Sequence, residues 1–223
     1  MENDIIPTEA EPIKIINGYC LEVLKRLPDN SIDLVLTDPP YGVRKKEEWD
    51  NFDNFINQID TWINECYRVS KNGVIWFCAS NMLPYILKNK EDIFHRILFW
   101  DKPMGSQFNG ASNNNLWYST ECILVFEKGE LRKKGKDSKY GYGFFQARTH
   151  KFDDFKHPTA KPYLLMQWLV KHYSDIEDII LDPFAGSGST GVVCKQLGRK
   201  FIGIELDSKH IETIKKRLQQ GVL

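Results

Sequence analysis

Four consecutive residues, Asp38-Pro39-Pro40-Tyr41, combine groups that could hold an aromatic amine. An exocyclic amine conjugated to its ring is a poor nucleophile, because its lone pair is delocalised. The Asp38 carboxylate and the Pro39 carbonyl can accept both amine hydrogens and favour a more pyramidal nitrogen, by electrostatics and orientation rather than prior deprotonation. The prolines stiffen the turn, and Tyr41 offers a ring on which a flipped base can stack. The alternative is a rigid Asp-Pro turn with a surface tyrosine.

A second motif has the residue types of a nucleotide-binding turn: Asp182-Pro183-Phe184-Ala185-Gly186-Ser187-Gly188-Ser189-Thr190. Its glycines permit close approach of a ligand, and the helix expected after it offers free N–H groups. Glu205, at the tip of the next expected strand, is placed to bind a ribose diol. The chain has no Gly-Lys-Ser/Thr, so ATP fits less well than another adenosine-bearing ligand. A purely structural strand-to-helix turn is the alternative.

Short apolar runs alternate with amphipathic stretches of helical length, which predicts an α/β fold with a mostly parallel sheet covered on both faces. We expect the two motifs to lie at the carboxyl edge of this sheet, where ligands of open α/β folds bind. Residues 94–100 and 120–127 should form an antiparallel pair at its edge. The expected strands are 13–17, 32–37, 73–79, 94–100, 120–127, 178–181 and 200–204, and the expected helices are 21–27, 52–69, 84–90, 162–173, 189–197 and 208–219.

The bulk composition bounds the class of protein. A chain of 223 residues with 42% hydrophobic residues is typical of one domain with a real core, so we expect a single domain over residues 1–223. Its longest apolar runs are far shorter than the ~20 residues that cross a bilayer, and residues 1–12 lack the features of a signal peptide. The five cysteines are scattered and form no CxxC pair, so neither a disulfide framework nor a metal site is indicated. A cytoplasmic location fits best.

The 30 basic and 30 acidic residues cancel, which by itself does not favour a nucleic-acid partner. The distribution is more informative than the sum. Six basic residues against two acids lie between Lys128 and Lys139, and four aromatic residues follow before residue 146. Residues 129–156 show no clear periodicity, so we expect an inserted loop element rather than core. A solvated flexible loop is the alternative to a nucleic-acid contact.

Three blocks together resemble the β-group DNA amino-methyltransferases. They are Thr37 to Gly42, His157-Pro158-Thr159-Ala160-Lys161-Pro162, and Asp182 to Thr190, and they stand in that group's chain order. The resemblance also covers Gly18 to Leu24 and the strand before Glu205. It implies a Rossmann-like S-adenosylmethionine-dependent methyltransferase fold with a circularly permuted motif order, in which target recognition lies just before the His157 block. The segment 129–156 occupies that place.

The resemblance also implies roles for individual residues. Asp38, Pro39, Pro40 and Tyr41 would hold the target base. Glu205 would bind the ribose of S-adenosylmethionine, His157, Thr159 and Lys161 would help to hold its methionine end, and Tyr19 and Cys20 would lie near its adenine. The rest of the cofactor site would be lined by Asp182, Phe184, Gly186, Ser187, Gly188, Ser189 and Thr190, with Asp38 where cofactor and base meet. The family usually has an acid where Tyr19 stands and a glutamine where Ala160 stands, so these two contacts do not transfer directly.

An Asp at the head of the Asp38 motif resembles the adenine-N6 enzymes more than the cytosine-N4 enzymes. We therefore expect transfer of a methyl group to the N6 amine of adenine in double-stranded DNA, with cytosine-N4 as the nearest alternative. RNA as substrate, a small-molecule methyltransferase and a non-catalytic nucleic-acid-binding protein of the same fold also remain open. The sequence does not decide between a monomer and a homodimer, or whether a cognate restriction enzyme accompanies the chain in a restriction-modification system.

Overall fold

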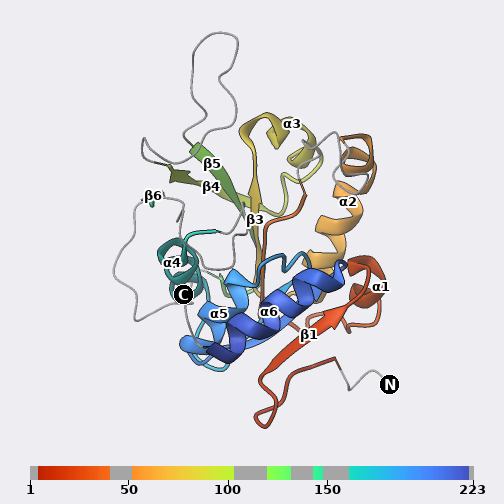
Figure 1. The fold of residues 1–223 in the computed structure, drawn as a ribbon. Coiled ribbons are helices and arrows are strands. Elements are labelled where there is room, and N and C mark those ends of the chain that lie inside the picture. Colours follow the sequence, from red (N-terminus) through yellow and green to blue (C-terminus); the bar gives the residue numbers. More distant parts are fainter. Residues whose placement is uncertain (1–4, 41–51, 103–119, 132–142, 148–160, 221–223) are drawn as a thin grey trace.

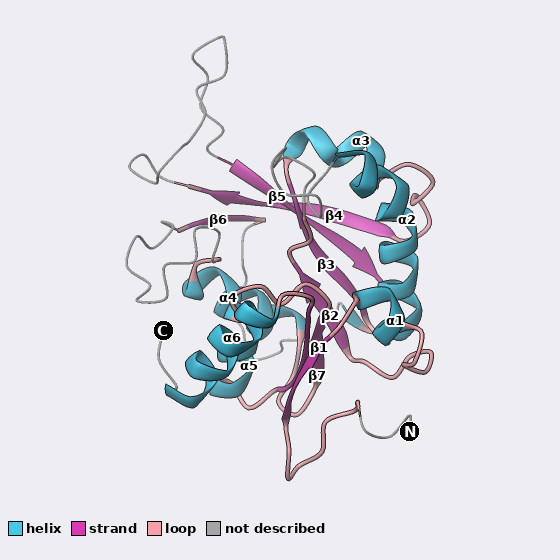
Figure 2. Ribbon diagram, turned by 45° about the vertical axis from the view of Figure 1, so that its right-hand side comes forward, coloured by secondary structure: helices cyan, strands magenta, loops and turns pink. Residues whose placement is uncertain are grey.

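A computed structural model describes residues 5–40, 52–102, 120–131, 143–147 and 161–220. An eight-stranded sheet lies between two layers of helices, with α1, α2 and α3 on one face and α4, α5 and α6 on the other (Figures 1 and 2). The strands are β1 (Ile13–Asn17), β2 (Leu34–Thr37), β3 (Gly73–Cys78), β4 (Phe94–Asp101), β5 (Thr120–Glu127), β6 (Phe144–Gln146), β7 (Ile179–Asp182) and β8 (Lys200–Glu205). The helices are α1 (Cys20–Leu24), α2 (Phe52–Val69), α3 (Leu83–Ile86), α4 (Tyr163–Tyr173), α5 (Ser189–Gln196) and α6 (Ser208–Gln220), and a 3-10 turn at Ser80–Met82 precedes α3.

The strand order is β1-β8-β7-β2-β3-β5-β4-β6. Neighbouring strands are parallel except at β5, which runs antiparallel to both β3 and β4. The expected α/β class, the mostly parallel sheet and the antiparallel pairing of β4 with β5 are confirmed. The expected position of that pair is wrong, because β6 pairs in parallel with β4 and extends the sheet beyond it.

The strand β6 also corrects the expectation for residues 129–156. We expected a loop element without regular structure there, but Phe144–Gln146 pair with Phe99, Trp100 and Asp101. Leu131 and Ala147 are buried in the same core cluster as Trp100. The described parts of this segment therefore belong to the sheet and its core, while most of the basic and aromatic stretch lies outside the described residues.

Helix α2 shows why the amphipathic pattern was informative. Phe55, Ile59, Trp62, Ile63 and Cys66 recur at helical spacing and are all at most 4% exposed against the sheet. Burial of each large apolar side chain contributes about 1.5–3 kcal/mol, so this face fixes the helix on the sheet. The observed bounds of α2 match the expected ones.

Two other helices end earlier than expected. We expected a helix over 21–27, but α1 ends at Leu24, and Arg68 of α2 donates hydrogen bonds to the carbonyls of Leu24 (2.8 Å) and Leu27 (2.9 Å). We expected a helix over 84–90, but α3 ends at Ile86, and Asn89 has a φ of 55°, which a helix does not allow.

Each face of the sheet carries its own core. One cluster joins the sheet to α1, α2 and α3, and the other joins it to α4 and α5. All five cysteines are buried free thiols within these layers. Within the described ranges no helix combines the length and apolar character needed to span a bilayer.

Candidate functional site

The two chemically suggestive motifs meet at the carboxyl edge of the sheet. Strands β2 and β7 are parallel neighbours, with Leu34 opposite Ile180 and Val35 opposite Leu181. The chain continues from β2 to β3 on one side and from β7 to β8 on the other. Such a switch point is where open α/β sheets bind ligands. Asp38, which directly follows β2, therefore lies beside the turn that follows β7, as the sequence predicted.

The carboxylate of Asp182 ties these two strand ends together. It accepts a hydrogen bond from the Thr37 hydroxyl (2.8 Å), from the Thr190 hydroxyl (2.7 Å) and from the backbone N–H of Phe184 (3.2 Å). Asp182 is 4% exposed. Burial raises the pKa of its carboxyl to about 6; the three hydrogen bonds oppose this shift, and the nearby charge of Asp38 adds to it. Asp182 thus joins the strand that carries Asp38 to the turn and helix that carry the second motif.

The glycines of the second motif serve two different needs. Gly188 has a φ of 78°, and a Cβ there would lie 3.0 Å from the Ile214 side chain of α6, so the helix packs directly on the turn. Gly186 has a φ of 51°, and the only described atom within 4 Å of a Cβ there would be the Phe184 carbonyl, at 3.8 Å. Space thus remains in front of Gly186. Arg217 of α6 donates to the Ser187 carbonyl at 2.7 Å and holds the turn from behind.

Glu205, the last residue of β8, lies directly beside this turn. One of its carboxylate oxygens accepts the backbone N–H of Gly186 (2.8 Å), and the other accepts that of Asp207 (2.9 Å). The imidazole of His210 is 3.5 Å from the second oxygen. A carboxylate offers about four lone-pair positions, so Glu205 can accept hydroxyl groups in addition to these bonds.

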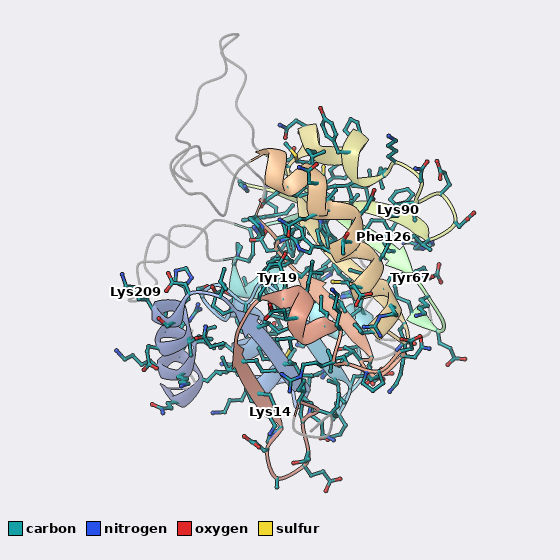
Figure 3. All side chains as sticks on the ribbon, turned by 90° about the vertical axis from the view of Figure 1, so that its right-hand side faces the viewer. Lys14, Tyr19, Tyr67, Lys90, Phe126 and Lys209 are labelled. Atoms are coloured by element: carbon teal, nitrogen blue, oxygen red, sulfur yellow. The ribbon has the colours of Figure 1, made fainter. Side chains whose placement is uncertain are left out.

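An apolar wall stands next to Glu205. The ring of Phe184 meets the rings of Trp62 (5.1 Å between centroids) and Trp76 (6.4 Å) edge-on. Tyr19, which caps the start of α1 (Figure 3), packs against the same cluster, and its hydroxyl donates to the side chain of Gln58. Cys20 is buried, and burial raises the pKa of its thiol to about 12, so it is an uncharged part of the wall. The structure therefore gathers Tyr19, Cys20, Phe184 and Glu205 at one edge, while their contacts with a cofactor stay predictions.

A cluster of charges surrounds Asp38 on the face of the sheet that carries α4. The Lys161 ammonium, just before α4, lies 2.6 Å from a carboxylate oxygen of Asp38 and 3.3 Å from one of Glu121. The second oxygen of Glu121 is 3.2 Å from the ammonium of Lys102. The side chain of Lys161 is 9% exposed. Burial lowers the pKa of Lys161, but the carboxylates of Asp38 and Glu121 outweigh burial, and the net shift is upward, so Lys161 is charged.

Aromatic rings complete this cluster. The Lys161 ammonium lies 5.0 Å from the ring centre of Phe77 and 5.7 Å from that of Trp100, and Lys102 lies 4.6 Å over the same Trp100 ring. The indole N–H of Trp100 donates to the Ala147 carbonyl at 2.9 Å, which links the cluster to the residue after β6. The sequence-based reasoning missed Glu121, Lys102 and Trp100. A signal for Glu121 was present, since this acid directly precedes the apolar run Cys122 to Phe126 of β5.

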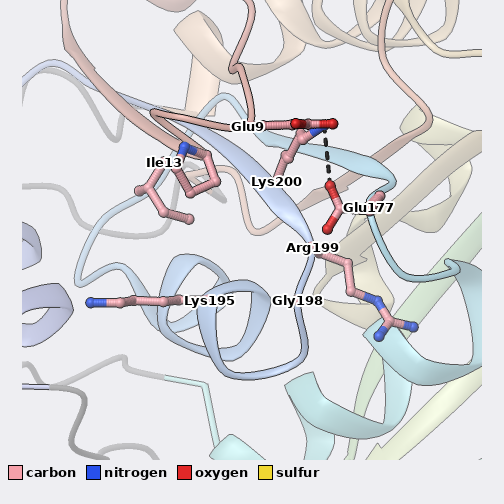
Figure 4. A pocket seen from close by; sticks show the side chains of 8 residues that line it. Glu9, Ile13, Glu177, Lys195, Gly198, Arg199 and Lys200 are labelled. Atoms are coloured by element: carbon pink, nitrogen blue, oxygen red, sulfur yellow. Dashed lines mark ion pairs between the residues drawn. The ribbon is translucent and has the colours of Figure 1, made fainter.

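Several expected site residues lie outside the described residues. These are Tyr41, His157 and Thr159, so their roles stay predictions. Of the other expected residues, Asp38, Lys161, Asp182, Phe184, Gly186, Glu205 and their neighbours in the turn lie at the carboxyl edge. A pocket lined by Pro12, Lys195 and Lys200 lies at the opposite edge, at the amino ends of β1 and β8 (Figure 4). It takes no part in this site.

A family model described as DNA methylase, for N6 and N4 methylases, matches residues 32–216, which include both motifs and the charge cluster. The chain belongs to the N6/N4 DNA methylase family. In the sequence of the methylase, the strand that precedes Asp38 (β2) comes before the strand that precedes the glycine turn (β7).

Individual relatives match nearly the whole methylase. It is 31% identical to the type II methyltransferase M.HinfI of Haemophilus influenzae, over 92% of this chain and 68% of that protein. It is also 31% identical to the type II methyltransferase M2.LlaDCHI of Lactococcus lactis subsp. cremoris, over 96% and 91%. The solved complex of M1.HpyAVI with S-adenosylmethionine matches with a TM-score of 0.72 and 28% identity, over 92% and 98%. The cytosine-N4-specific PvuII DNA methyltransferase shares the fold, with a TM-score of 0.75 and 17% identity, over 92% and 88%.

The cofactor of this family is S-adenosylmethionine, and the residues of this methylase fit it. The space in front of Gly186 admits a ligand close to the backbone. The partly buried Phe184 ring offers an apolar surface for an adenine, and Glu205 offers carboxylate oxygens for ribose hydroxyls. An apolar wall beside a hydroxyl acceptor at the tip of the next strand is the arrangement that an adenosine needs.

Proposed function

We propose that this methylase transfers a methyl group from S-adenosylmethionine to the N6 amine of adenine in double-stranded DNA. The observation that carries the proposal is the contact of the two half-sites: Asp38 follows the strand whose Thr37 is bonded to Asp182 of the cofactor turn. A group held by Asp38 would therefore lie next to a ligand held by that turn. The Asp at the head of the motif supports adenine over cytosine.

The residues of the chain would act by binding and orientation. Asp38 and the Pro39 carbonyl would accept the amine hydrogens, and the ammonium of Lys161, 2.6 Å from Asp38, favours the ionised carboxylate that this requires. S-adenosylmethionine supplies an electrophilic methyl group bonded to a sulfonium. Tyr41 would stack on the flipped base, while His157 and Thr159 would help to hold the methionine end.

The donor site would be set by the residues already described. Glu205 would accept ribose hydroxyls, and Phe184, with Tyr19 and Cys20 behind it, would contact the adenine. Gly186, Ser187, Gly188, Ser189 and Thr190 would bring the backbone close to the ligand. Asp182, whose carboxylate oxygens are hydrogen-bonded within the protein, would act mainly by fixing the distance between donor and acceptor.

The segment 129–156 would read the DNA sequence. Its basic residues would contact phosphates, and its aromatic residues outside β6 would stack or contact bases. A segment of this size can place few side chains in a groove, so we expect a short recognition sequence or help from a second copy of the chain. The names of the relatives, type II methyltransferases, support a place in a restriction-modification system with a cognate restriction enzyme. Five buried free thiols fit the cytoplasm, where such DNA lies.

A single labelling experiment tests the base and the substrate together. The methylase is incubated with S-adenosylmethionine labelled in the methyl group and with mixed-sequence DNA, and the DNA is digested to nucleosides. Label in N6-methyladenine is expected. Label in N4-methylcytosine instead would replace adenine by cytosine, and no label in DNA would refute the proposed function. An excess of unlabelled RNA should not compete.

A further inference from the structure

Glu121 takes part in no predicted motif, yet it is a buried acid at the centre of the charge cluster. It is the second residue of β5 and is 7% exposed. Burial of an ionised carboxylate is costly unless other charges compensate it. In the described part of the chain, Glu121 has such partners in Lys161 at 3.3 Å and Lys102 at 3.2 Å.

Counted over the described residues, the four charges of this cluster balance. Asp38 and Glu121 carry one negative charge each, and Lys161 and Lys102 carry one positive charge each. Asp38 and Glu121 contact the same ammonium, so the contacting oxygens of the two carboxylates lie within about 6 Å of each other, a distance at which charges interact strongly in a protein interior. The charge of Glu121 therefore acts on Asp38.

We propose that Glu121 is a positioning residue for methyl transfer, because it shares the buried ammonium of Lys161 with Asp38 and so sets how strongly Asp38 can accept the hydrogens of the amine. The inference rests on the proposed function. Lys161 alone would draw the charge of Asp38 toward itself and weaken it as an acceptor. The negative charge of Glu121 offsets this effect of the Lys161 ammonium on Asp38. The ammonium of Lys102 in turn compensates the charge on the second carboxylate oxygen of Glu121.

Other titratable groups of the described residues also face Asp38. Asp182 of β7 acts on it through its charge, and burial raises the pKa of Asp182 to about 6. The thiols of Cys78 in β3 and Cys122 in β5 lie near Glu121, and burial raises the pKa of both, so they stay uncharged. Among the residues that the structure describes, the charges near Asp38 that can be removed without removing a motif residue are those of Glu121 and Lys102.

Two substitutions that remove opposite charges test the proposal. Glu121→Gln removes the negative charge and keeps the size of the side chain. When kcat is measured as a function of pH, it falls at low pH, where Asp38 becomes protonated; this acidic limb should move to lower pH by about one to two pH units. In the same variant kcat at pH 8 should fall about tenfold, while the KM for S-adenosylmethionine should stay within about twofold, because Asp38 becomes a weaker acceptor. Lys102→Gln removes a positive charge and should move the same limb to higher pH.

The double variant Glu121→Gln/Lys102→Gln should lie between the two single variants. Glu127→Gln is the matched control, since Glu127 is the last residue of the same strand and pairs with His95 at 3.2 Å, away from Asp38. This control should leave the limb in place. A merely structural role of Glu121 would not move the limb in opposite directions for opposite charges.

The outcomes separate the inference from the proposed function. An active wild type in which Glu121→Gln and Lys102→Gln shift the limb in the same direction, or not at all, overturns the inference alone. A wild type that transfers no methyl group to DNA overturns the proposed function and the inference with it. If Glu121→Gln does not fold, Lys102→Gln decides, because the Lys102 side chain is partly exposed; the expected upward shift supports the inference and its absence overturns it.

Discussion

The buried carboxylate of Asp182 should make the methylase less stable as the pH rises through about 6. Its pKa rises from the usual 3.8 to about 6 in the folded chain, mainly by burial. Between these values the folded chain binds more protons than the unfolded chain, so the free energy of unfolding falls as the pH increases. The full difference between these two pKa values corresponds to a change of about 3 kcal/mol in the free energy of unfolding. Between pH 5 and pH 8 the expected loss is about 1.4 kcal/mol.

Asp182→Asn isolates this contribution. The amide keeps the shape, its oxygen can still accept from Thr37, and its nitrogen can donate to the Thr190 hydroxyl, which can rotate to accept. We expect the variant to gain about 1.4 kcal/mol relative to wild type from pH 5 to pH 8, measured by urea unfolding at each pH. The other titratable groups are the same in variant and wild type, so their contributions cancel when the two free energies of unfolding are subtracted.

The control for this series is Glu212→Gln, which removes an exposed carboxylate of α6 that pairs with Lys215 at 3.6 Å. Exposed pairs contribute little to stability, so this variant measures the effect of charge removal without burial. The reasoning would be refuted if the free energy of unfolding of Asp182→Asn, relative to that of wild type, stayed constant or fell from pH 5 to pH 8.

Three further predictions concern the site. Asp38→Ala should lower kcat at least about a hundredfold and largely keep S-adenosylmethionine binding, measured by calorimetry and turnover; a variant with normal turnover would contradict the role of Asp38. Gly188→Ala should cost about 1–3 kcal/mol of stability in thermal unfolding, because φ is 78° and the new Cβ would meet Ile214 at 3.0 Å, whereas wild-type stability would argue against this packing. Replacing Lys133, Lys134 and Lys136 by Gln should weaken DNA binding and flatten its salt dependence, with cofactor binding as the internal control; an unchanged salt slope would remove these residues from the DNA interface.

The elements of this fold could be predicted where a local pattern suffices. Helix α2 and strand β5 follow from helical spacing and from a continuous apolar run, and both were predicted with the observed bounds. Strand β6 could not be predicted, because three residues carry no period and its pairing with β4 depends on chain that is distant in sequence. The carbonyl of Leu24, at the end of α1, likewise accepts a hydrogen bond from Arg68 of another helix, a contact that no local pattern predicts.

The site divides in the same way. Asp38, Glu205 and the glycine turn could be predicted, since each follows a recognisable strand and has a residue type suited to its task. The place of Glu121 could not, because its partners come from two distant segments, at Lys102 and Lys161. Thr37 was read only as part of a motif, while its bond to Asp182 depends on the adjacency of β2 and β7.

The bond between Thr37 and Asp182 spans 145 residues, and this has a consequence for how the methylase becomes active during synthesis. The strand that carries Asp38 leaves the ribosome long before its neighbour β7 exists, and contacts of such long sequence separation form late and slowly. The central strand therefore has one edge unpaired until the last quarter of the chain is made. Its backbone groups are then open to pairing with other chains, so a truncated product should aggregate rather than act as a partial enzyme.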